Sequence, residues 1–139
     1  LVGDGPTRMA IESTAGDRVL FPGATDDPRP YLAAADVAVM PSRWEGLSLA
    51  MLEAMASGRS LVVTDVAGAE VVRRSGGGAV VPVDDPASLA AAVVERLTGR
   101  VDIEAEGRRG HDWVERNHDF DTEMSRFAAV ITRAHAFGR

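Results

Sequence analysis

The chain has 139 residues, which is the size of one domain or of part of one. Its 15 basic and 21 acidic side chains give a formal charge of −6, which argues against a nucleic-acid groove or an anionic membrane surface as the main partner. All 15 basic residues are Arg, so Schiff-base chemistry on a lysine of this chain is excluded. Cysteine is absent, which excludes disulfides, thiolate metal sites and cysteine nucleophiles.

Short apolar runs alternate with helical patterns along the chain. The predicted strands are 19–21, 36–40, 60–64 and 79–83, with residues 1–2 as the tail of a further strand. One helix is predicted to open at Pro6, and two more cover 30–35 and 47–57. A fourth starts at Asp85-Pro86 and has Leu89, Val93 and Leu97 on one face, and a last helix has a stripe of Phe127, Ile131 and Ala134. Buried strands separated by helices favour an α/β fold, a doubly wound Rossmann-like parallel sheet with flanking helices. The sequence contains no run of 18 apolar residues, so no membrane span is predicted.

The most informative segment, 41–58, runs from the end of a predicted strand into a predicted helix that starts near Leu47. A helix start offers free backbone N–H groups and the positive end of the helix dipole, which together bind phosphate. Gly46 lets a ligand approach the backbone closely, and Ser48 either caps the helix or donates its hydroxyl. Ligands of such sheets lie beyond the carboxyl ends of the strands, where this segment falls.

Two carboxylates, Glu45 and Glu53, lie in this segment, and Glu53 is the only charge in a helix that is predicted to be buried. On one continuous helix they would lie on related faces, two turns and about 12 Å apart. That span suits the two ends of one extended ligand better than a pair sharing a proton. The alternative is that Glu53 bonds a neighbouring backbone group and that Glu45 stabilises the helix N-terminus.

Other polar and aromatic residues have two readings each. Arg43 contacts a bound sugar or phosphate, or is an ordinary surface arginine, and Arg73 is expected on a solvated face. Trp44 stacks on a sugar or base, or packs at the strand end. His111 and His118 are seven residues apart, but no carboxylate spacing beside them makes a metal site, so no metal is expected.

The ordered pattern Pro-Ser-x-x-Glu-Gly-Leu-Ser-Leu-x-x-Leu-Glu-Ala-Met-Ala-x-Gly over 41–58 resembles the retaining glycosyltransferases of the GT-B fold. The similarity is to the carboxyl-terminal domain of the family-4-type group, the glycosyl transferases group 1. Further matching segments are 3–6, 36–42, 60–65 and 78–86. The resemblance implies that residues 1–139 are part of a nucleotide-sugar-binding domain that lacks its first strand, and that the N-terminal acceptor domain is absent and is supplied in cis or in trans.

The resemblance assigns roles to the central residues. It implies that Glu45 is catalytic, facing the donor sugar and supporting the positive charge that develops at the anomeric carbon. It also implies that the backbone of Gly46, Leu47 and Ser48 holds the diphosphate, and that Glu53 accepts hydrogen bonds from the ribose hydroxyls.

Further donor-binding residues are expected around these. Gly5 lies in the glycine turn of the family, Gly23 and Thr25 lie in a loop expected against the nucleobase, and Arg43 is expected near the sugar or phosphate. Segment 66–70 departs from the family pattern, because it has Ala where a second Gly is common.

The function implied for the parent protein is transfer of a hexose, with retention, from a UDP- or GDP-linked donor to a glycan, lipid or small molecule. No cofactor beyond the donor and no nucleic-acid partner are expected. We expect a bacterial, cytoplasmic protein whose parent associates peripherally with membranes, and a homodimer formed by strand exchange. The isolated chain is expected to be inactive. The alternative is a non-catalytic donor-binding subunit or nucleotide-sugar sensor that a partner chain completes.

Overall fold

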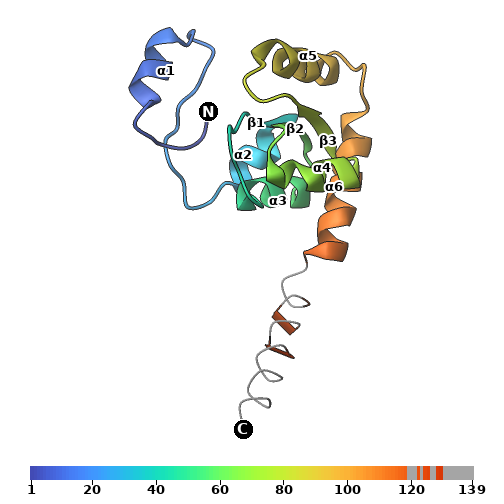
Figure 1. Ribbon diagram of the computed structural model, residues 1–139. Helices are drawn as coiled ribbons and strands as arrows, with labels where there is room; N and C mark the ends of the chain where they lie inside the picture. The colour runs from blue at the N-terminus through green and yellow to red at the C-terminus, as the bar shows by residue number, and fades with distance from the viewer. Residues whose placement is uncertain (119–121, 123, 126–127, 130–139) are drawn as a thin grey trace. The chain divides into compact units, whose positions relative to one another are not determined.

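The computed structural model describes residues 1–118, 122, 124–125 and 128–129 (Figure 1). The chain forms two compact units, Leu1–Ala34 and Ala35–Arg139, and each is described by itself. The predicted stripe on Phe127 and Ile131, with Ala134, lies outside the described residues. In the described part of the chain, no helix has both the length and the apolar character needed to cross a membrane.

The first unit holds two short helices, α1 (Arg8–Thr14) and α2 (Arg29–Ala34), which confirm the helices predicted near Pro6 and at 30–35. The strand predicted at 19–21 is wrong. The only pairing in this region is an isolated parallel bridge between Val2 and Gly23, in which the Gly3 N–H donates to the Gly23 carbonyl at 2.8 Å. Pro22 has no N–H to donate, so a ladder of regular hydrogen bonds does not extend along this segment.

The second unit is built on a parallel sheet of three strands in the order β1 (Val37–Met40), β2 (Ser60–Thr64), β3 (Gly78–Val81). These confirm three of the predicted strands. All five residues of the central strand β2 are buried, as its uninterrupted apolar run predicts. Close pairing with β3 needs a glycine at position 78, because a side chain there would overlap the backbone of Leu61.

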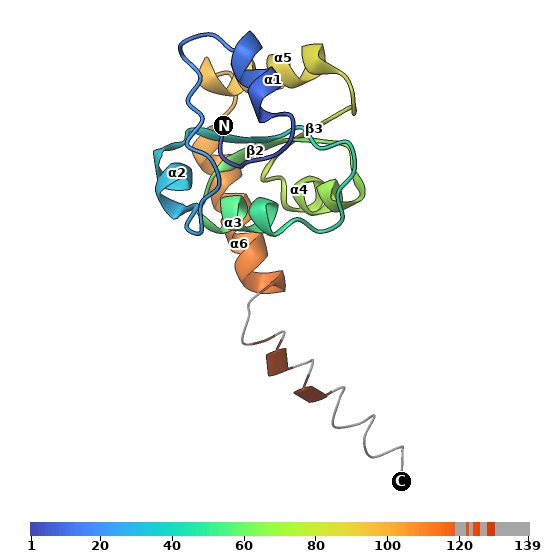
Figure 2. The same ribbon diagram turned by 90° about the vertical axis from the view of Figure 1, so that its left-hand side faces the viewer.

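Helices cover both faces of this sheet, as Figures 1 and 2 show. α5 (Pro86–Leu97) packs on one face, and α3 (Leu49–Ala56), α4 (Glu70–Ser75) and α6 (Ile103–Asn117) pack on the other. A single 3-10 turn, η1 (Ala67–Ala69), joins β2 to α4. The doubly wound α/β arrangement that the sequence predicts is therefore confirmed, although α4, α6 and η1 were not predicted.

The hydrophobic core on the α5 face is formed by Val62, Val81 and Ala92, with partly buried Val37, Ala79, Leu89 and Val93 packed against it. Leu97 was expected on the same stripe, but it is 60% exposed. The buried residue at that end of α5 is its neighbour Arg96, which takes the inward position through an ion pair.

The start of α5 follows its sequence signal closely. Asp85 is the N-cap, and its carboxylate accepts hydrogen bonds from the Ser88 backbone N–H at 3.0 Å and from the Ser88 hydroxyl at 2.6 Å. These bonds favour the ionised form and lower the pKa of Asp85. Pro86 occupies the first turn, where its missing N–H costs nothing.

α6 is attached to the sheet by two unusual features. Its Gly107 lies against the Gly58 carbonyl so closely that a side chain at position 107 would overlap that oxygen. Its Glu106 is buried in an ion pair with Arg96, with Nη2 and Oε1 2.7 Å apart, and the Ser60 hydroxyl donates to the same carboxylate at 2.6 Å. A helix rich in charges is thus held by a backbone contact with the turn between α3 and β2 and by one buried polar cluster that includes Ser60 of β2.

Candidate functional site

The loop 41–48, which follows β1 and leads into α3, lies at the carboxyl end of the sheet, where the resemblance places the donor. Thr64, the last residue of β2, is buried, and its hydroxyl donates to the Ser42 carbonyl, with the Met40 carbonyl 3.4 Å away. β2 therefore positions the loop in two ways: its backbone pairs with β1, which precedes the loop, and its Thr64 side chain bonds a carbonyl of the loop. Sequence reasoning missed this role, because nothing in a threonine at a strand end signals which carbonyl it will meet.

Gly68 in η1 also contacts this loop. Its backbone N–H donates to the Glu45 carbonyl at 3.3 Å. A side chain at position 68 would overlap the Gly46 carbonyl oxygen and lie 2.9 Å from its carbon. Gly68 is the glycine within 66–70, and the lack of a side chain there allows η1 to contact the loop.

The helix after this loop begins at Leu49, two residues later than predicted, with Ser48 as its N-cap. The Ser48 side chain makes no capping hydrogen bond, so no side chain of the cap covers the first N–H groups of α3. Because the helix begins after Glu45, the spacing that one continuous helix would give Glu45 and Glu53 does not apply. Glu45 is in the loop and Glu53 is in the second turn of α3.

The two carboxylates are available to a ligand. Glu45 is half-buried and Glu53 is exposed, and within the described part of the chain neither carboxylate has a hydrogen-bond or ion-pair partner. The expectation that Glu53 is buried is wrong, because the buried face of α3 consists of Met51, Ala54 and Met55. The alternative in which Glu53 bonds a neighbouring backbone group does not describe this structure.

Two arginines at this edge of the sheet are paired with acids. Arg43 Nε lies 2.8 Å from Asp84 Oδ1, and this bond raises the pKa of Arg43. Arg73 Nη2 lies 2.6 Å from Asp65 Oδ1, which raises the pKa of Arg73. Trp44 is 86% exposed, so the alternative in which it packs at the strand end is wrong, and its ring is open to solvent.

Three predicted donor residues belong to the unit Leu1–Ala34. The Thr25 hydroxyl donates to the Asp27 carbonyl at 3.0 Å and accepts from the Asp27 N–H at 3.1 Å, so it closes a local turn. Asp27 Oδ1 in turn accepts from the Arg29 N–H at 3.1 Å at the start of α2. Gly23 has φ +88°, which a side chain rarely adopts, and the Gly5 carbonyl accepts from the Arg8 N–H at 3.0 Å.

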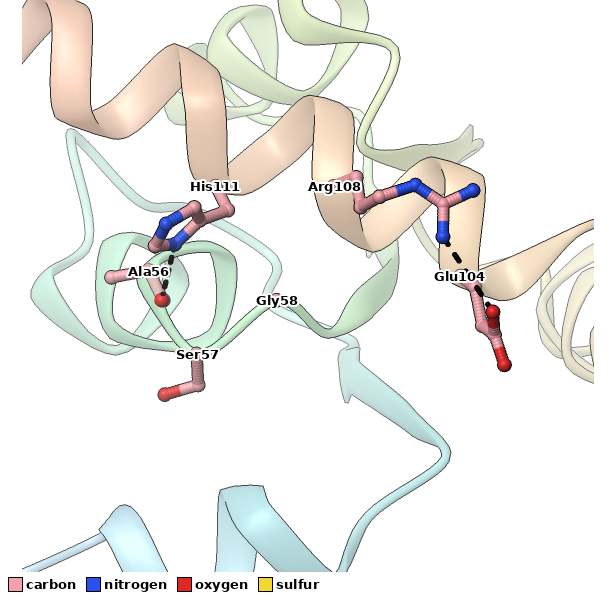
Figure 3. A pocket seen from close by; sticks show the side chains of 6 residues that line it. All are labelled: Ala56, Ser57, Gly58, Glu104, Arg108 and His111. Carbon is pink, nitrogen blue, oxygen red and sulfur yellow. Dashed lines mark hydrogen bonds and ion pairs between the residues drawn. The ribbon is translucent and has the colours of Figure 1, made fainter.

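A cavity of about 440 Å³ lies at the opposite end of α3 from Glu45 (Figure 3). Ala56, Ser57 and Gly58 line it from the end of α3, and Glu104, Arg108 and His111 line it from α6. His111 Nδ1 lies 2.7 Å from the Ala56 carbonyl and so joins α6 to the end of α3, whereas the 3.5 Å pair between Arg108 and Glu104 lies within α6. Among the described residues no group of three acidic or histidine side chains is placed to hold a metal ion.

The fold and the site together define a doubly wound α/β domain with a helix start after β1 and, among the residues that the structure describes, two unpaired carboxylates in that loop and helix. The chain belongs to the glycosyl transferases group 1, whose family model matches residues 1–99.

Relatives and solved structures of this kind match most of the chain. It is 36% identical over 118 residues to the lipopolysaccharide core biosynthesis glycosyltransferase LpsE of Rhizobium meliloti, covering 81% of this chain and 35% of that protein. It is 34% identical, over an alignment of 146 positions, to a GDP-mannose-dependent alpha-(1-6)-phosphatidylinositol monomannoside mannosyltransferase of Mycobacterium tuberculosis. This alignment covers 94% of this chain and 38% of that protein. The chain therefore spans little more than a third of the length of these relatives.

The structural likeness has the same extent. The sucrose-phosphate synthase of Thermosynechococcus elongatus superposes with a TM-score of 0.87 at 26% identity, over 97% of this chain and 38% of that one. Anabaena HepE, solved in complex with UDP, superposes with a TM-score of 0.81 at 21% identity, over 95% and 40%. The second likeness shows the fold alone.

Proposed function

We propose that this chain binds the nucleotide-diphosphate sugar donor of a glycosyltransferase. The observation that carries the proposal is the pair of carboxylates, Glu45 and Glu53, that have no partner in the described part of the chain and lie before and after a helix start that its N-cap side chain leaves open. Membership of the glycosyl transferases group 1 supports it, as do relatives that are named as sugar transferases.

In this proposal each group acts by electrostatics and position. The N–H groups of Gly46, Leu47 and Ser48 and the positive end of α3 neutralise the leaving diphosphate. Glu45 faces the sugar and stabilises the positive charge that develops at the anomeric carbon, and Glu53 accepts hydrogen bonds from the ribose hydroxyls. Such groups accelerate the reaction because they are fixed before the charge develops.

The finer features are proposals too. The donor is a UDP- or GDP-linked hexose, transfer retains the anomeric configuration, and an acceptor domain in cis or in trans completes the site. No cofactor beyond the donor takes part. A glycan or lipid acceptor is supported by relatives named for lipopolysaccharide core and phosphatidylinositol mannoside synthesis. In this proposal the protein is a bacterial one that works in the cytoplasm.

The donor site is tested by the melting temperature of the chain with UDP-, GDP- and ADP-sugars. One of these donors is expected to raise the midpoint, since a ligand at about 100 times its Kd adds about 2.7 kcal/mol of stability. Glu53→Gln and Glu45→Gln are each expected to weaken that donor about ten- to hundredfold, because each removes a charged hydrogen-bond acceptor.

Glu95→Gln is the matched control, because Glu95 is an exposed carboxylate on α5. It is expected to leave the donor affinity unchanged. Failure of all three donors to stabilise the chain would contradict the proposal, and so would equal affinities in Glu53→Gln and Glu95→Gln.

A further inference from the structure

Three carbonyl groups of the loop 41–48 are turned toward β2 or η1. The Ser42 carbonyl accepts from the Thr64 hydroxyl, and the Glu45 carbonyl accepts from the Gly68 N–H at 3.3 Å. The Gly46 carbonyl oxygen lies where a side chain of Gly68 would be. Three carbonyls of one short loop thus meet two residues, Thr64 and Gly68.

The direction of a carbonyl fixes the direction of the next N–H. In a trans peptide plane the C=O of one residue and the N–H of the following residue point in opposite directions, and the described residues contain no cis peptide bond. The N–H groups of Arg43, Gly46 and Leu47 are therefore turned away from β2 and η1. Of these, the N–H groups of Gly46 and Leu47 come directly before Ser48, the N-cap of α3.

We propose that Thr64 and Gly68 are positioning residues for the diphosphate of the donor. They hold carbonyl oxygens, which would repel an anion, on the side of β2 and η1, and so present N–H groups to the ligand. This inference rests on the proposed function, because it assigns supports to the same anion site. Neither residue needs to touch the ligand, since both act through the peptide planes of the loop.

The space available for a side chain at Gly68 and at Gly46 supports the same assignment. A methyl group at Gly68 would have to push the Gly46 carbonyl away, which rotates the peptide that carries the Leu47 N–H. A methyl group at Gly46 itself would meet nothing within 4 Å. The requirement for glycine therefore applies to the supporting residue, Gly68, whereas the space beside Gly46 is open to a ligand.

The test compares binding of UDP with uridine, and of GDP with guanosine, by amide chemical-shift titration of the full 139-residue chain. Thr64→Val removes the hydroxyl and is expected to weaken the preferred nucleoside diphosphate about fivefold, the effect of one hydrogen bond. Thr64→Ser keeps the hydroxyl and is expected to restore the affinity. Affinity for the nucleoside without phosphates is expected to stay within a factor of two of wild type (about 0.4 kcal/mol).

Two control variants separate positioning from general loss of stability. Thr98→Val removes another threonine hydroxyl-to-carbonyl bond, the exposed one from Thr98 to the Val94 carbonyl at 2.7 Å, at the end of α5. Gly77→Ala creates a milder backbone clash away from the loop, with the added methyl group 2.9 Å from the Gly110 Cα. Both are expected to keep the wild-type affinity below their melting midpoints, whereas Gly68→Ala is expected to lose about tenfold or more.

The possible failures are distinct. A wild-type chain that binds neither UDP nor GDP overturns the proposed function and the positioning role with it. A wild-type chain that binds, with Thr64→Val binding as tightly, overturns the positioning role alone. Equal weakening of nucleoside and nucleoside diphosphate in Thr64→Val also overturns it, because the effect is then not on the diphosphate. Where Gly68→Ala does not fold, the Thr64 variants decide.

Discussion

Replacing Arg96 by methionine is expected to lower the free energy of unfolding by about 3–5 kcal/mol. Arg96 and Glu106 are 5% and 9% exposed at their side chains and share two hydrogen bonds, Nη2 to Oε1 at 2.7 Å and Nε to Oε2 at 2.9 Å. Arg96→Met leaves the Glu106 carboxylate buried without its counter-charge. Urea unfolding followed by circular dichroism measures the loss.

Two further variants identify the cause. Arg96→Met combined with Glu106→Leu removes both charges, and we expect it to recover most of the lost stability, because no buried charge is left unpaired. Arg108→Met breaks the exposed pair with Glu104, whose side chains are 66% and 84% exposed, and is expected to cost less than about 1 kcal/mol. Equal losses in Arg96→Met and Arg108→Met would show that burial of the pair does not matter.

Replacing Gly107 by alanine is expected to destabilise the chain by about 1–3 kcal/mol, the usual cost of forcing extra atoms into a packed contact. The added methyl group would overlap the Gly58 carbonyl oxygen and lie 2.8 Å from its carbon. Both contacts are to backbone, so α6 has to move away from the end of α3. The shift in the thermal or urea midpoint measures this.

Gly110 provides the matched control on the same helix. A methyl group there would lie 3.5 Å from the Gly77 Cα and 3.6 Å from Met55 Cγ, which are ordinary contacts. Gly110→Ala is therefore expected to stabilise the chain by about 0.5–1 kcal/mol, because alanine loses less backbone entropy in a helix. Destabilisation of similar size in both variants would contradict the difference in contact that the structure shows.

The parts of the fold that could be predicted are those with local signals. The strands 60–64 and 36–40 are apolar on both faces, and Asp85-Pro86 marks the start of α5, so pattern and capping rules predict them. α6 could not be predicted in this way. Its buried positions are Glu106, Gly107 and Gly110, which form no apolar stripe.

The candidate site divides in the same manner. The sequence indicated Glu45, Gly46 and Glu53 as a group, because a strand end, a glycine and a helix start are adjacent along the chain. It misjudged the exposure of Glu53 and the first residue of α3, because the direction of a helix face is set by what packs against it.

Sequence patterns were enough to predict the parallel α/β arrangement, the capped start of α5 and the segment in which a donor is expected to bind. The pairing of Arg96 with Glu106, the contact of Gly107 with Gly58, and the contacts of Thr64 and Gly68 with the loop of Glu45 became visible only in the folded chain. The two groups differ in the sequence distance over which the interactions act. Hydrophobic period and helix caps act between near neighbours in the chain, whereas these ion-pair, glycine and carbonyl contacts join residues that only folding brings together.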